Sequence, residues 1–199
     1  MNSINKISSS KGTSLMEVLV TMIIVLIGLL GIAALQVKAQ TAELESYQRA
    51  QALIILSDIV DKLNVNRDTA SCFRFTTSTS GTPYIGVAAT ATPSCTASTT
   101  AYNTQAVATI TEISNFLQGT DAVMGGSNVG AMIGARACIS YDASTEIGGN
   151  PDTGLYTIAV SWQGMSILST PSASCANNTY GDEGQRRTVA ITTRIANLN

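Results

Sequence analysis

A single apolar run near the N-terminus constrains this 199-residue chain more than any other feature. Residues 15–35 contain one charged side chain, Glu17, and one other polar side chain, Thr21. As an α-helix, the uncharged stretch 18–35 would be about 27 Å long, close to the roughly 30 Å hydrocarbon core of a bilayer. A core helix normally keeps one polar face, whereas this run is apolar on all sides. We therefore expect a helix that inserts in a membrane or in the interior of a fibre.

The residues that precede the run suggest how it is processed. They include Lys6 and Lys11 and no acidic residue, which favours a cytoplasmic N-terminus. No small-residue secretory cleavage site follows the run, but Gly12 precedes it, and a cut there would remove the polar leader and keep the apolar segment. A carboxylate near the start of a membrane helix is costly, so Glu17 needs a partner, and the α-amine of Thr13 freed in a neighbouring chain would supply one. The alternative is that Glu17 is a tolerated charge near the lipid headgroups.

The ten residues KGTSLMEVLV, from Lys11 to Val20, resemble the prepilin signature of type IV pilins and pseudopilins. The resemblance implies that a prepilin peptidase cleaves between Gly12 and Thr13, that the amine of Thr13 is methylated, and that Glu17 is required for assembly. Thr13 departs from the phenylalanine most common in the family. The lack of proline in residues 13–70, where major pilins often have one, points to a minor pilin.

Residues 36–67 contain neither proline nor glycine, and apolar residues recur there mostly three or four positions apart. This spacing predicts an amphipathic helix with a buried stripe of Leu44, Tyr47, Leu53, Leu56, Ile59 or Val60, and Leu63. It also predicts the ion pairs Glu45–Arg49 and Asp58–Lys62. We expect one continuous helix from Ser14 to about Val65; the alternative is two helices joined near Gly28 and Gly31. The segments 31–36, 49–52 and 59–67 are similar to PilV-type minor pilins.

The C-terminal part is predicted to be a small domain. No charged residue occurs in 75–111, and residues 76–104 include 14 Ser or Thr, so we expect a surface excursion with little regular structure, the alternative being a glycosylated or adhesive loop. A short helix is predicted to end at Gly119, because apolar residues before it have helical spacing: Val107, Ile110, Ile113 and Leu117. Strands are predicted at 131–141, 155–163 and 188–196, with a turn at 148–152. The predicted fold class is α+β: a pilin-like long N-terminal helix packed on a small antiparallel sheet.

The four cysteines all follow the apolar run, which places them on the oxidising, periplasmic side of the membrane. Two disulfides are expected; three pairings are possible, of which we favour Cys72–Cys95 with Cys138–Cys175. The chain has no C-x2-C pair and no histidine, which argues against zinc, and we expect no cofactor. Asp182 and Glu183 could join a calcium site, but solvated turn charges are the favoured interpretation.

Composition argues against catalysis and against nucleic-acid binding. Without histidine, no Ser-His-Asp or Cys-His site can be built, so no catalytic residue is assigned. The net charge is −2, and Arg186 with Arg187 is too small a basic patch to bind DNA. The match of residues 177–179 to an N-glycosylation sequon is taken as chance.

We expect four segments: a leader at 1–12, a transmembrane or fibre-core helix at 13–35, an amphipathic helix at 36–67 and a disulfide-bonded domain at 68–199. The resemblance implies a minor pilin that supports pilus assembly, twitching motility, adhesion or DNA uptake. Its partners would be other major and minor pilins, the prepilin peptidase and the inner-membrane assembly machinery. It would cross the inner membrane once, with a periplasmic domain, before joining the pilus. The alternatives are a pseudopilin of type II secretion and a membrane-tethered surface or DNA receptor.

Overall fold

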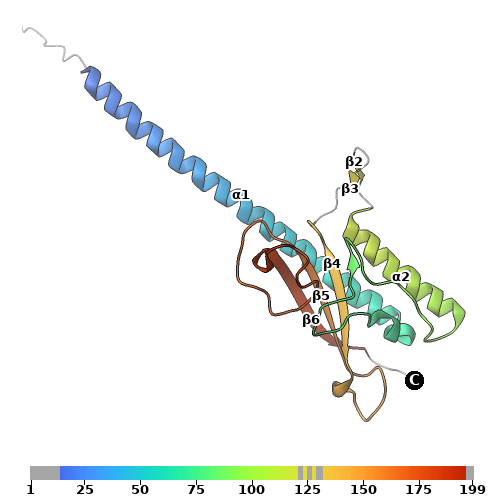
Figure 1. Ribbon diagram of the computed structural model, residues 1–199. Helices are drawn as coiled ribbons and strands as arrows, with labels where there is room; N and C mark the ends of the chain where they lie inside the picture. The colour runs from blue at the N-terminus through green and yellow to red at the C-terminus, as the bar shows by residue number, and fades with distance from the viewer. Residues whose placement is uncertain (1–13, 121–122, 125–126, 129–131, 196–199) are drawn as a thin grey trace, which may run out of the picture. The chain divides into compact units, whose positions relative to one another are not determined.

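The computed structural model describes residues 14–120, 123–124, 127–128 and 132–195. By their internal contacts the residues form two units, 1–43 and 44–199, and we describe each unit by itself. Most of the secondary structure belongs to the second unit (Figure 1).

The first helix, α1, runs from Leu15 to Val65, so the prediction of one continuous helix is confirmed and a break at Gly28 or Gly31 is wrong. Ser14 caps its start: the Ser14 hydroxyl accepts a hydrogen bond from the Met16 amide at 3.3 Å, and the Ser14 carbonyl accepts one from the Glu17 amide at 2.9 Å. Glu17 lies in the first turn, where a carboxylate interacts favourably with the helix dipole. By length and composition α1 can cross a membrane.

The buried stripe of α1 differs from the predicted one. Leu56, Ile59 and Leu63 are buried as expected, but Leu44, Tyr47 and Leu53 are each about half exposed. The buried residues follow a four- and three-residue spacing through the second half of the helix: Gln48, Ala52, Ile55, Leu56, Ile59 and Leu63. The prediction was based on the most apolar side chains. The buried face is instead fixed by which side of the helix is turned toward the core, and that side includes a glutamine and an alanine.

A four-stranded antiparallel sheet has the order β1-β4-β5-β6. Its strands are β1 (Ile85–Gly86), β4 (Arg136–Asp142), β5 (Leu155–Gln163) and β6 (Arg186–Arg194). β5 has the predicted bounds. β4 begins at Arg136 instead of 131, because Gly134 adopts a left-handed φ of 63° that is incompatible with an extended strand. A second, two-stranded sheet pairs β2 (Val123–Met124) with β3 (Ser127–Asn128).

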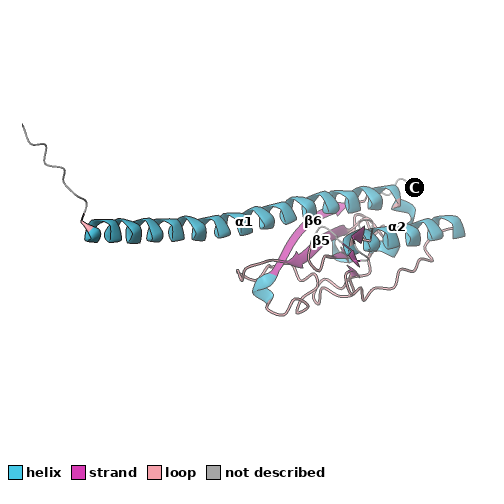
Figure 2. Cartoon of the chain, turned by 90° about the horizontal axis from the view of Figure 1, so that it is seen from above, coloured by secondary structure: helices cyan, strands magenta, loops and turns pink. Residues whose placement is uncertain are grey.

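One face of the sheet packs on the second half of α1 and on α2 (Thr100–Gln118). The side chains between these elements form the core of the second unit. Figure 2 shows β5 and β6 beside this part of α1. The core includes Ile59 from α1, Ile113 from α2 and Ile158 from β5, all with at most 1% exposure. α2 ends at Gly119, as predicted, with a left-handed φ of 69°. The α+β class is therefore confirmed.

The prediction of little regular structure at 75–111 is partly wrong. Thr76, Tyr84 and Ile85 are buried, β1 adds an edge strand to the sheet, and α2 begins at Thr100. The local sequence does not predict the regular structure of this segment, because that structure depends on pairing with β4 and on a disulfide. Both join residues that are distant in the chain. The described residues also form three short 3-10 helices: η1 (Arg67–Phe73), η2 (Ala143–Thr145) and η3 (Glu183–Gln185).

Candidate functional site

The described part of the first unit is an uncovered apolar helix. Every residue from 14 to 43 is exposed, and the large apolar side chains between Leu15 and Val37 are 44–84% exposed. Glu17 is the only charged residue between 14 and 37, and it too is exposed. Such a surface is stable only in lipid or against other apolar helices, since about 25 cal/mol is lost for each Å² of apolar area left in water. The predicted cleavage residues Gly12 and Thr13 lie outside the described residues, so both remain predictions.

The structure joins Cys72 to Cys95 and Cys138 to Cys175, the pairing that the sequence analysis favours, and no cysteine is free. The first disulfide links η1 to the segment that precedes α2. The second joins β4 to the long connection between β5 and β6, residues 164–185. Both disulfides therefore fix segments with little regular structure to the body of the second unit.

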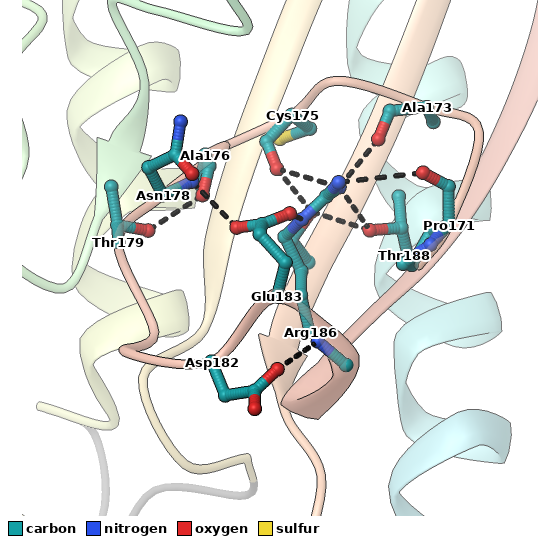
Figure 3. A network of polar contacts seen from close by, with 12 residues as sticks. Pro171, Ala173, Cys175, Ala176, Asn178, Thr179, Asp182, Glu183, Arg186 and Thr188 are labelled. Carbon is teal, nitrogen blue, oxygen red and sulfur yellow. Dashed lines mark hydrogen bonds and ion pairs between the residues drawn. The ribbon is translucent and has the colours of Figure 1, made fainter. Parts of the chain in front are cut away.

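Arg186 anchors the connection that carries Cys175 (Figure 3). Its side chain is 2% exposed and pairs with the Glu183 carboxylate, Nε to Oε2, at 2.7 Å. Its Nη1 donates to the carbonyls of Ala173 and Cys175 and to the Thr188 hydroxyl, and its Nη2 donates to the carbonyl of Pro171. One buried guanidinium thus holds three backbone carbonyls of the connection in place.

Arg187 holds the other end of the same connection against α1. Its guanidinium lies 3.2 Å from the Glu45 carboxylate, which also accepts hydrogen bonds from the Ser166 hydroxyl and the Met165 and Ser166 amides. Burial acts to raise the pKa of Glu45, but the Ser166 hydrogen bond and the Arg187 charge outweigh it and hold the pKa below its usual value. The predicted Glu45–Arg49 pair is therefore wrong, whereas Asp58–Lys62 is present at 3.1 Å.

The two acidic residues considered for calcium serve the fold. The Asp182 carboxylate caps η3 by accepting from the Gly184 amide at 2.8 Å, and Glu183 pairs with Arg186 and accepts from the Asn178 amide. Among the described residues, no group of three or more acidic or cysteine side chains is placed to hold a metal ion. Arg186 and Arg187 are likewise engaged within the chain, so they do not form a basic surface patch.

Sequence reasoning missed the structural role of Arg186 and Arg187. Adjacent residues of a strand point to opposite faces of the sheet, so the pair can hold the connection from both sides. The available signal was weak: the two arginines follow a long uncharged stretch, residues 164–181, and are separated from it by four residues that include Asp182 and Glu183.

Comparison with known proteins adds one finding. The model of a family described as Tt1218-like, type IV pilin Tt1218, matches residues 34–107. No curated protein and no solved structure matches the chain. The matched segment does not include Lys11–Val20, so it is independent of the prepilin-like signature. The family match, the long apolar N-terminal helix and the small antiparallel sheet together support a type IV pilin-like protein.

Proposed function

We propose that this chain is a PilV-like minor pilin of a type IV pilus. The observation that carries the proposal is the apolar half of α1, whose side chains are all exposed in the single chain. A helix of this kind is suited to two environments in succession, the inner membrane before assembly and a bundle of like helices afterwards. The role is structural: the chain contributes one helix to the fibre, and its disulfide-bonded unit faces the periplasm and then the fibre surface.

Processing would precede assembly. A prepilin peptidase cuts after Gly12, removes the leader with Lys6 and Lys11, and methylates the amine of Thr13. In the assembled fibre the Glu17 carboxylate of one subunit pairs with the Thr13 amine of a neighbour. An isolated charged side chain in the apolar centre of a membrane costs roughly 3 kcal/mol. The pairing removes this cost for Glu17 in the fibre core.

Substitutions at Glu17 separate the proposed charge pair from any effect of this residue on the start of α1, which Ser14 caps. Ser14-x-x-Glu17 has the spacing of a capping box, in which glutamine can replace glutamate. Glu17→Gln therefore keeps the capping ability and removes only the charge, whereas Glu17→Ala removes both. A matched control is Thr21→Ala, one turn further on, which deletes a hydroxyl that only returns a hydrogen bond to the Val18 carbonyl at 2.8 Å.

The measurement is the amount of each variant in sheared pili relative to the amount in membranes. We expect normal cleavage for all three, loss from pili for both Glu17 variants, and normal incorporation for the Thr21 control. Incorporation of Glu17→Gln at the wild-type level would refute the charge-pair mechanism.

Deletion of the gene followed by imaging of the cell surface tests the function itself. Fewer or absent surface pili support the minor-pilin proposal. Unchanged pili with a defect in protein secretion would instead indicate a pseudopilin. Unchanged pili and secretion with reduced attachment would indicate a tethered surface receptor.

A further inference from the structure

A pocket of about 340 Å³ lies on the face of the sheet opposite α1, entirely within the second unit. Its floor consists of two cross-strand pairs of β4 and β5, Ser140 with Thr157 and Cys138 with Ala159. One wall is the segment 76–81 and the other is the segment 172–175. The volume falls in the range of small-molecule sites.

The walls are fixed by contacts to each other and to the sheet. The Thr76 amide donates to the Ile139 carbonyl, and the Thr76 hydroxyl accepts from the Ile139 amide, both at 3.0 Å, so the first wall pairs with β4. The Ala176 amide donates to the Gly81 carbonyl at 3.0 Å, and the Ser174 hydroxyl donates to the Ser78 carbonyl. The Cys138–Cys175 disulfide joins the second wall to the floor. The pocket is therefore formed before any ligand arrives.

Two further residues maintain this geometry. Gly81 has a φ of 66°, and a Cβ atom there would lie 1.8 Å from the Ser174 carbonyl oxygen, so only glycine lets the two walls approach this closely. Arg186, which does not line the pocket, donates to the carbonyls of Ala173 and Cys175 in the second wall (Figure 3). The buried arginine thus positions the wall without presenting its charge to the pocket.

The chemistry of the lining is unusually uniform. Among the described residues that line the pocket, seven are Ser or Thr and none is charged or aromatic. Within the described part of the chain, five of the seven side-chain hydroxyls have no hydrogen-bond partner: Ser78, Thr79, Ser140, Thr157 and Ser172. Thr76 and Ser174 use theirs to fix the walls.

This lining disfavours most ligand classes. An anionic ligand is bound best by a free guanidinium or ammonium group. The nearby Arg186 does not supply one, because it is buried and paired with Glu183. A divalent cation is bound by carboxylates, and a large apolar ligand by large apolar side chains. The described residues that line this pocket include neither. The lining offers free hydroxyls, two of them on the floor, beside the small apolar groups of Ala159 and the disulfide, against which the C–H face of a non-aromatic ring can pack. These features match a ligand with a C–H face and a rim of hydroxyls.

We propose that this pocket binds a neutral saccharide, with the Ser140 and Thr157 hydroxyls on its floor as the principal hydrogen-bonding groups. The proposal goes beyond assembly of the fibre and does not depend on it, since the pocket lies wholly within the second unit.

The test uses the full chain in micelles of an amine-oxide detergent, because glycoside detergents would compete for the site. Saturation-transfer NMR is recorded with glucose, galactose, mannose, N-acetylglucosamine, maltose and lactose, and with sialic acid as an anionic comparison. The variant Ser140→Ala/Thr157→Val removes both floor hydroxyls and retains the shape of the strands. Its matched control, Thr193→Val, makes the same change on the other face of β6.

We expect at least one neutral saccharide to bind, about tenfold weaker binding by the double variant, and unchanged binding by the control. The emission of Trp162, which is buried in the core, verifies that each variant is folded. The proposal is overturned if no saccharide binds, if the folded double variant binds as well as the control, or if sialic acid binds more tightly than every neutral sugar.

Discussion

Replacing Arg186 by methionine should destabilise the second unit much more than the same change at Arg194, which lies at the other end of β6. Methionine keeps an unbranched chain in the buried space but removes the guanidinium, leaving the Glu183 carboxylate and the carbonyls of Pro171, Ala173 and Cys175 without their donor. Breaking a buried ion pair costs about 3–5 kcal/mol. Because Glu183 is 21% exposed and can turn to water, we expect a value near the lower limit, about 3 kcal/mol.

The matched control is Arg194→Met. Arg194 also bonds to backbone carbonyls, those of Thr145 and Thr153 at 2.8 and 2.7 Å, but it is exposed, so water can replace it and the loss should stay below about 1 kcal/mol. The only tryptophan of the chain, Trp162, is buried in the core and reports unfolding of this unit by fluorescence.

Urea titration of the full chain in micelles measures both variants. With a slope of about 2 kcal/mol per molar urea, Arg186→Met should lower the midpoint by about 1.5 M and Arg194→Met by less than about 0.5 M. Equal midpoints for the two variants would refute the role assigned to the buried guanidinium.

Three further changes test the fold by the same titration. Ile59→Ala, at a fully buried position of α1, should cost about 2–5 kcal/mol, whereas the exposed Ile54→Ala should cost less than about 0.5 kcal/mol; equal losses would contradict the observed helix phase. The pKa of Glu45 is lowered in the fold, so its contribution is present above the unfolded pKa and lost as the pH falls through the lower folded value. Lowering the pH from 6 to 3 should therefore destabilise wild type more than Glu45→Gln, and parallel losses would argue against the Glu45–Arg187 contact. Reduction of both disulfides should cost about 3–4 kcal/mol for each loop closed, and an unchanged midpoint after verified reduction would contradict their structural role.

The parts of the fold that local sequence predicts well are those with one unbroken pattern. α1 could be drawn to within a residue because no proline interrupts it, and because the change from all-apolar to amphipathic composition occurs without a turn signal. β5 was predicted with its exact bounds because its residues are rich in β-formers and it follows a clear turn at Gly148 and Gly149, both with positive φ.

Most of the errors share a physical cause, which is burial imposed by distant residues; the start of β4 is an exception, since the backbone of Gly134 sets it locally. Gln48 is buried and Tyr47 exposed because the position of the sheet, and not hydrophobicity, selects the packed face of α1. Arg186 is buried because backbone carbonyls surround it, and carbonyls leave no signature in the sequence. The pocket on the opposite face of the sheet could not be predicted from the sequence either. Its walls are brought together by a disulfide and by a close approach at Gly81, both between residues distant in the chain.

The central claim is that this chain is a processed subunit of a surface fibre. The most direct test is mass spectrometry of the chain recovered from sheared, purified pili, with the membrane fraction of a Gly12→Asp strain as the comparison. Our account predicts that the chain in pili begins at a methylated Thr13, and that the variant keeps residues 1–12 and is absent from pili. A chain that is missing from wild-type pili, or that is present there with its first twelve residues, would contradict the account.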